Sequence, residues 1–136
     1  MTTLYFAMII RGAYGEDATP AIIAKNLETA CQKAYVLKEH FPNIKWIVPH
    51  DDDIVNILHR NKKVESQDII DAELELIRSN KVDGVIAVGD VPVGSGVAQE
   101  VNTCHLADKM VCFLDDVDEK GRQVFAEELM AWGLNE

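Results

Sequence analysis

The apolar residues of this chain form short continuous runs that alternate with longer stretches in which they recur every three or four positions. The short runs are Leu4–Ile10, Ile44–Val48, Gly84–Val88 and Met110–Leu114. Runs of this length, bounded by Gly, Pro or polar residues, are typical of strands buried on both faces of a parallel sheet. The longer stretches have the spacing of amphipathic helices.

Capping residues indicate where these helices begin. Thr19-Pro20 predicts the first helix, with Thr as N-cap, and it should run to about His40. Its expected buried positions are Ile23, Leu27, Ala30, Cys31, Ala34 and Leu37. Asp51-Asp52-Asp53 predicts the start of a short helix through Leu58, because carboxylates suit a positive helix terminus.

Three more helices are expected further along the chain. One begins at Ser66 or Glu65 and ends near Ser79, and another opens after the turn Gly94-Ser95-Gly96. An acidic turn from Asp115 to Glu119 precedes the last helix, Gln123–Trp132, whose inward residues should be Phe125, Leu129 and Trp132.

Strands that alternate with helices predict an α/β fold with right-handed crossovers. We expect a single domain over residues 1–136, with a three-layer, doubly wound, flavodoxin- or Rossmann-like parallel sheet of four to five strands flanked by helices. In such sheets the ligand cleft lies outside the carboxyl ends of the strands, where the strand order reverses. The loops at that edge should be 10–17, 49–53, 89–96 and 115–118.

Two glutamates interrupt the apolar faces of predicted helices. Glu100 shares a helical row with Val97, Cys104 and Ala107. Glu73 falls inside an arc of apolar side chains, whereas its acidic neighbours Asp71 and Glu75 fall on the opposite side, as does Arg78. A helix-terminus role for Glu100 and pairing of Glu73 with a basic residue are the alternatives to a role in chemistry.

Composition narrows the classes of partner. The formal net charge of −10 excludes broad binding to nucleic-acid polymers or anionic membranes, although a small anionic ligand remains compatible. Cys31, Cys104 and Cys112 form no paired framework, which indicates reduced thiols. The chain lacks a signal-peptide pattern and an apolar run long enough to span a bilayer, so we expect a cytoplasmic protein.

A metal site is the other interpretation of His50 and Asp51–Asp53. Acidic runs of this kind are more often helix caps, and the four histidines are scattered without ligand spacing. We therefore expect neither a metal nor a cofactor.

Three segments resemble one family, in the same order along the chain. Tyr5-Phe6-Ala7-Met8-Ile9-Ile10-Arg11-Gly12, with Gly15-Glu16-Asp17 beyond it, resembles the opening strand and loop of the nucleoside 2-deoxyribosyltransferase superfamily. The nearest branch is the 2'-deoxynucleoside 5'-phosphate N-hydrolases. Ser95-Gly96-x-x-x-Glu100 resembles the nucleophile motif of that family. The helix before Val82-Asp83-Gly84-Val85-Ile86 resembles the one that bears its acidic catalytic partner.

The resemblance implies cleavage of the N-glycosidic bond of a nucleoside or a (deoxy)nucleoside 5'-monophosphate, by hydrolysis or base transfer. It implies that Glu100 is the nucleophile, that Tyr5 orients it and that Glu73 is the acidic partner. Asp90, which ends a strand beside the expected cleft, is the other candidate acid. The resemblance places Arg11, Gly12, Ser95 and Gly96 in the cradle for sugar and phosphate. Proteins of this family commonly assemble, so a homo-oligomer is also expected.

A two-carboxylate site suits this reaction because the sugar passes through an oxocarbenium-like state and the base needs a proton as it leaves. The rival hypothesis is a non-catalytic nucleotide-binding or sensing module of the same fold. It is favoured by Met8-Ile9, which stands where the family has Gly-Ser. A receiver-type signalling domain is disfavoured, because Arg11-Gly12 follows the first strand where such domains need an acidic pair.

Overall fold

Strands and helices alternate along the chain, as the hydrophobic pattern predicts. The computed structural model describes residues 1–9, 19–48 and 66–134, without the side chains of 66–69. Its elements are β1 (Thr3–Ala7), α1 (Pro20–His40), β2 (Lys45–Ile47), α3 (Ser66–Arg78), β3 (Gly84–Val88), α4 (Gly96–Leu106), β4 (Met110–Leu114) and α5 (Glu119–Ala131). The predicted helix from Asp51 to Leu58 and the histidine before it lie outside the described residues.

The four described strands form one parallel sheet in the order β2-β1-β3-β4. In the register Tyr5 lies opposite Ile47 on β2 and opposite Val85 on β3. The chain moves outward from β1 to β2 and then crosses to β3 on the other side of β1. The strand order therefore reverses between β1 and β3, which is where doubly wound sheets place their ligand cleft.

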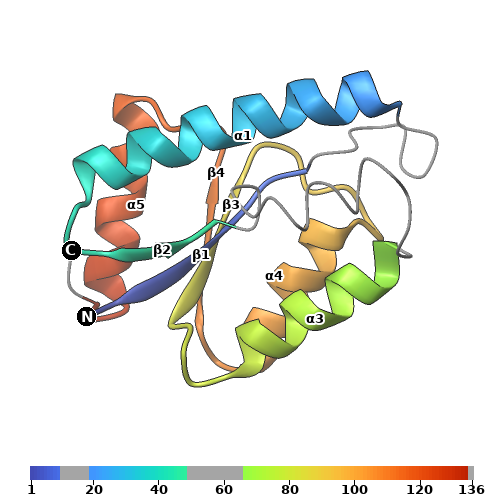
Figure 1. Ribbon diagram of the computed structural model, residues 1–136. Helices are drawn as coiled ribbons and strands as arrows, with labels where there is room; N and C mark the ends of the chain where they lie inside the picture. The colour runs from blue at the N-terminus through green and yellow to red at the C-terminus, as the bar shows by residue number, and fades with distance from the viewer. Residues whose placement is uncertain (10–18, 49–65, 135–136) are drawn as a thin grey trace.

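Helices cover both faces of the sheet, so the three-layer α/β prediction is confirmed. Figure 1 shows α1 and α5 on one side of the strands and α3 and α4 on the other. Side chains alternate along β1: Leu4 and Phe6 join the core beneath α1 and α5, whereas Tyr5 and Ala7 join the core beneath α3 and α4. The alternation fixes the face on which the Tyr5 hydroxyl lies.

Phe113, in a run expected to be buried on both faces, is 58% exposed on β4, at the edge of the described sheet. The core positions predicted for the first and last helices are buried, with two exceptions. Trp132 is wrong as an inward residue: it is the C-cap of α5 and is 47% exposed, because the helix ends at Ala131 and the indole leaves the buried row of Phe125 and Leu129. Cys31 is half-buried rather than buried. All three cysteines are free, as expected.

Helix α5 begins four residues before the predicted Gln123. The carboxylate of Asp118 caps it by accepting a hydrogen bond from the Gly121 N–H at 2.8 Å. The first turn is polar, so it lacks the apolar periodicity on which the prediction rested. The β1 and β2 strands are also shorter than their apolar runs, because β1 ends at Ala7 and β2 at Ile47.

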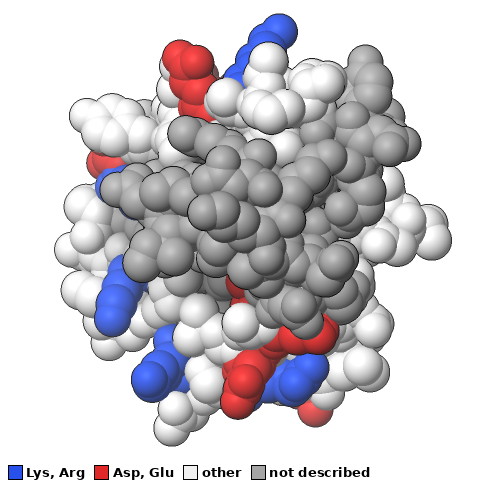
Figure 2. All heavy atoms as spheres, turned by 45° about the vertical axis from the view of Figure 1, so that its right-hand side comes forward, with Lys and Arg blue, Asp and Glu red and all other residues white. Residues whose placement is uncertain are grey.

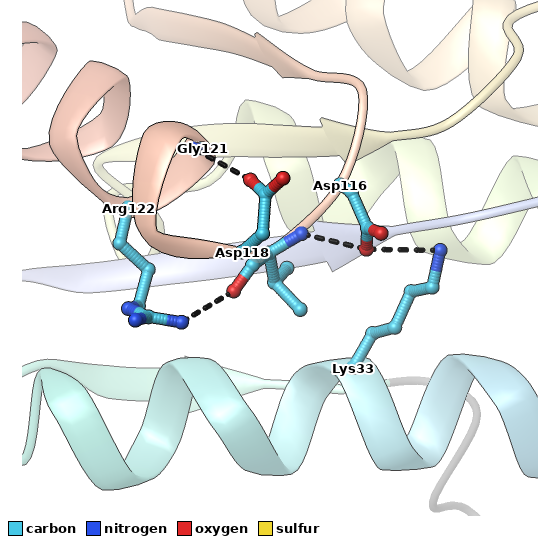
Figure 3. A network of polar contacts seen from close by, with 6 residues as sticks. Lys33, Asp116, Asp118, Gly121 and Arg122 are labelled. Atoms are coloured by element: carbon cyan, nitrogen blue, oxygen red, sulfur yellow. Dashed lines mark hydrogen bonds and ion pairs between the residues drawn. The ribbon is translucent and has the colours of Figure 1, made fainter.

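The acidic turn between β4 and α5 is held by its own polar contacts (Figure 3). The carboxylate oxygen Oδ1 of Asp116 lies 3.2 Å from Lys33 Nζ on α1 and accepts a hydrogen bond from the Val117 N–H at 2.8 Å. Arg122 Nη1 donates to the Val117 carbonyl at 2.8 Å. These contacts tie the carboxyl end of β4 to α1 and α5, and they explain the acidic residues without a ligand.

Gly121→Ala should destabilise the protein by about 3 kcal/mol, because a Cβ at this position would overlap the backbone carbonyl oxygen of Asp116. Denaturant unfolding measures the loss. Lys120→Ala is the matched control, since this exposed neighbour should change the free energy of unfolding by less than about 0.5 kcal/mol. Equal stability of Gly121→Ala and wild type would contradict the packing described for this turn.

Candidate active site

Tyr5, Glu73 and Glu100 meet between the sheet and the α3–α4 layer, although they come from three different elements. Tyr5 packs in one core cluster with Ile77 of α3 and with Val97 and Cys104 of α4. Glu73 lies one helical turn before Ile77, and Glu100 lies between Val97 and Cys104 on the same helix face. The fold thus brings together the three residues that the sequence analysis had placed at the centre of the reaction.

Local structure around the glycine turn sets the direction of Glu100. Gly94 has a φ of +80°, a left-handed conformation that suits glycine, and it leads into the N-cap Ser95. The Ser95 hydroxyl accepts a hydrogen bond from the Ala98 N–H at 3.1 Å, which fixes the start of α4. Glu100 is then in the second turn, on the inward row predicted for it.

Glu73 occupies the inward side of α3 at its boundary with solvent. Leu74 and Ile77 beside it are buried, whereas Asp71 and Glu75 are exposed, as the helical wheel predicts. Glu73 itself is half-buried. Of the two carboxyl groups, that of Glu73 is therefore the more accessible to a ligand.

The Tyr5 hydroxyl and one oxygen of Glu100, Oε2, are buried without a hydrogen bond of normal geometry to any described residue. Tyr5 is 1% exposed and Glu100 is 4% exposed. Buried polar atoms are nearly always hydrogen bonded in folded proteins. Their polar neighbours are each other and Glu73, so the hydrogen bonds at this place are poorly formed, which indicates a site built for something other than stability.

Electrostatics at the three groups favour their neutral forms. Burial raises the pKa of Glu100 well above its usual value, and the adjacent carboxylate of Glu73 raises it further. Burial also raises the pKa of Glu73, partly offset by its polar contacts with Glu100 and Tyr5. Burial, followed by the charges of Glu100 and Glu73, raises the pKa of the Tyr5 hydroxyl. Because the two carboxyl groups lie side by side, we expect them to share one proton at pH values at which ordinary carboxyls have lost theirs.

No cation neutralises this pair within the part of the chain that the structure describes. The groups that shift the pKa values of Glu73 and Glu100 are each other and Tyr5, and no lysine or arginine is among them. Elsewhere the surface carries both signs: Figure 2 shows acidic and basic side chains interspersed on the described portion of one face. Among the described residues, the pair therefore has no compensating positive charge when it ionises.

Asp90 does not join the buried pair. It is exposed in the loop after β3 and is not among the groups that shift the pKa of Glu73 or Glu100. Ser95 and Gly96 lie at the start of α4, and each has a structural role there, Ser95 as the N-cap and Gly96 in close contact with Ile70. Arg11 and Gly12 lie outside the described residues, so their expected part in a sugar and phosphate cradle stays a prediction.

Sequence reasoning missed Lys109, which follows α4. Its Nζ donates to the carbonyl of Ile77 at 2.7 Å and to that of Ser79, both at the end of α3. A single lysine in a turn has no periodic or motif signal, and its partners are about 30 residues away in sequence. The link between Lys109 and α3 is therefore visible only in three dimensions.

A shallow groove lies apart from these groups, between α4 and the edge strand β4. Its volume is about 310 Å³, and its lining includes Ala98, Val101, His105, Val111 and Phe113. None of the predicted site residues lines it.

The described residues also contain no cluster of three or more His, Cys, Asp or Glu that could hold a metal ion. Within the same residues, no helix has the length and apolar character needed to cross a bilayer.

The chain matches no protein-family model, no curated protein and no solved structure. The likeness to nucleoside 2-deoxyribosyltransferases thus rests on the residues quoted above. The geometry of Tyr5, Glu73 and Glu100 is observed independently of that likeness.

Stability should fall as the pH rises above the ordinary glutamate pKa of 4.5, because the folded state keeps a proton that the unfolded carboxyls release there. A carboxyl group whose pKa is raised in the folded state contributes its full stabilisation below the pKa of the unfolded state. That stabilisation is lost as the pH rises toward the pKa of the folded state. One such proton changes the free energy of unfolding by up to about 1.4 kcal/mol per pH unit.

Denaturant unfolding at several pH values tests this linkage. Glu100→Gln should flatten the dependence on pH, because the amide cannot ionise. Glu75→Gln, an exposed carboxylate on the outer side of α3, is the matched control and should keep the wild-type slope. If Glu100→Gln and wild type lose stability in parallel, the pair does not hold the proton.

Proposed function

We propose that this protein cleaves the N-glycosidic bond of a nucleoside or a (deoxy)nucleoside 5'-monophosphate, by hydrolysis or by base transfer. The observation that supports it is the pair formed by the half-buried Glu73 and the buried Glu100 beside the buried hydroxyl of Tyr5, which is in polar contact with both. Because no cation among the described residues neutralises it, an ionised carboxylate at this position stabilises positive charge that develops on a sugar. An oxocarbenium-like transition state carries such a charge, whereas the neutral substrate does not.

In the proposed reaction, the Glu100 carboxylate attacks the anomeric carbon of the sugar. The bond between that carbon and the base nitrogen breaks, and its electron pair leaves with the base, which takes a proton from Glu73. Water then attacks the anomeric carbon of the glycosyl ester and restores Glu100, transferring its proton to Glu73. A second base in place of water completes a transfer. The Tyr5 hydroxyl orients Glu100 by donating a hydrogen bond to it.

These roles require the shared proton to be on Glu73 when the sugar is attacked. In the free protein Glu100 is the more deeply buried of the two, and burial favours the proton there. A substrate that places its positive-going anomeric carbon beside Glu100 favours the ionised form of that residue and moves the proton to Glu73. Substrate binding would therefore determine that Glu73 acts as the acid and Glu100 as the nucleophile. Asp90 is the other candidate proton donor.

A non-catalytic nucleotide-binding or sensing module is the second candidate function. It is supported by Met8 and Ile9, which follow β1 where the related enzymes have Gly-Ser. Both side chains are half-buried, and they pack against the two core clusters on opposite faces of the sheet. They add bulk and supply no hydroxyl donor for a phosphate.

Three further expectations accompany the proposal. The ligand is a small nucleoside or nucleotide rather than a nucleic-acid polymer, in keeping with the net charge of −10. Copies of the chain associate into a homo-oligomer, as in the enzymes that it resembles. The reaction takes place in the cytoplasm, where nucleotide pools and reducing conditions suit a protein with free thiols.

Incubation with a panel of ribo- and deoxyribonucleosides and their 5'-monophosphates should release free base, detected by chromatography. Glu100→Gln should lower the rate by at least about 1,000-fold, because it removes the nucleophile. Glu75→Gln should keep the wild-type rate. Addition of a second free base to the reaction distinguishes transfer from hydrolysis.

Two results of this panel would argue against the enzyme. Base release that persists undiminished in Glu100→Gln would exclude the proposed nucleophile. Thermal stabilisation of the protein by a nucleotide without any release of base would favour the binding module.

A further inference from the structure

Two close contacts join α3 to α4 and the turn that follows α4, one on either side of the carboxyl pair. The first contact joins Ile70 of α3 to Gly96 of α4, and the second joins the carbonyls of Ile77 and Ser79 to Lys109. Along the first segment Glu73 lies between the two contacts, and along the second segment Glu100 lies between them.

The first contact depends on the absence of a side chain at Gly96. A Cβ there would lie 3.0 Å from Cδ1 of Ile70 and 3.3 Å from its Cγ1. Such distances are tighter than ordinary contacts between carbon atoms. Any larger residue would require Ile70, or the whole of α3, to move by a few tenths of an ångström. Gly96 therefore sets how closely α3 approaches the start of α4.

The second contact is polar. The last carbonyls of a helix have no partner within it, and a cation there is favoured by the helix dipole. Lys109 satisfies two carbonyls at the end of α3, while its own N–H donates to the Cys104 carbonyl of α4 at 3.2 Å. Lys109 thereby links the end of α3 directly to the end of α4.

We propose that Gly96 and Lys109 are positioning residues that hold Glu73 and Glu100 within reach of each other. Two carboxylates repel when both are ionised, and their helices would relax apart unless something opposed the movement. Lys109, bonded to the end of α3, opposes the movement at one end of the pair, and at the other end the absence of a Cβ at Gly96 lets Ile70, and with it α3, lie close to the start of α4. This inference rests on the proposed function in taking the pair as the reacting groups, and it assigns Gly96 a role through Ile70 rather than through contact with a ligand.

Gly96→Ala tests the first contact, with Ile70→Val as its rescue. The alanine should lower kcat for base release by about 10-fold and change KM little, since small misplacements of catalytic groups have large effects on rate. In the double variant Gly96→Ala/Ile70→Val the Cδ1 methyl that meets the new Cβ is gone, so kcat should return toward that of Ile70→Val alone. Failure of Ile70→Val to restore activity would overturn the positioning role of Gly96.

Lys109→Met and Lys109→Arg test the second contact. Methionine keeps the aliphatic length but cannot donate, whereas arginine keeps the donors. Lys109→Met should lower kcat and should also reduce the pH dependence of unfolding that the carboxyl pair gives the wild type, and Lys109→Arg should restore both in part. A loss of stability in Lys109→Met that is the same at pH 5 and pH 8, with an unchanged pH profile of base release, would show a merely structural lysine and overturn the proposal.

The pH dependence of unfolding needs no substrate, so the two proposals can fail separately. If the wild type releases no base from any member of the panel, the glycosidase proposal fails. The unfolding measurements on Gly96→Ala, its double variant and the Lys109 variants still report whether the two residues hold the pair together. If base release depends on Glu100 while Gly96→Ala and Lys109→Met keep the wild-type dependence of unfolding on pH, the positioning role fails and the proposed enzyme activity stands.

Discussion

The structure depends on a single unfavourable interaction, the placing of a buried and a half-buried carboxyl group next to each other and to a buried tyrosine hydroxyl. Neither Glu73 nor Glu100 has a basic partner among the described residues, and the Tyr5 hydroxyl makes no hydrogen bond of normal geometry there. Natural proteins seldom retain such groups for stability, because apolar side chains of similar volume would pack as well without the penalty. They retain them where a raised pKa or an unpaired polar atom serves chemistry.

The topology of the sheet explains how this pair arises from an ordinary α/β fold. The reversal of strand order between β1 and β3 leaves β1 central, so a side chain that points from β1 toward α3 and α4 is fully buried. Tyr5 is on that face by the alternation of the strand. The inward rows of α3 and α4 then meet above it, each carrying one glutamate among apolar residues.

Much of this arrangement could be predicted from periodicity. The bounds of β3 and β4, the capped start of α1, and the inward rows of Glu73 and Glu100 follow from short-range patterns, because each depends on residues within one or two turns. Trp132 and the start of α5 could not be predicted, because a polar capped turn and the end of a helix break the same periodicity. Lys109 and the close approach of Ile70 to Gly96 depend on contacts between segments distant in sequence, for which no local pattern exists.

The protonation of the carboxyl pair itself is the most direct test of this account. A titration of the glutamate side-chain carboxyl carbons by ¹³C NMR, with assignments from Glu73→Gln and Glu100→Gln, follows each group without any substrate. We predict that one proton of the pair is released well above the ordinary range of a glutamate and that removing either glutamate shifts the titration of the other. Ordinary, independent titration of both residues near 4.5 would contradict the central claim.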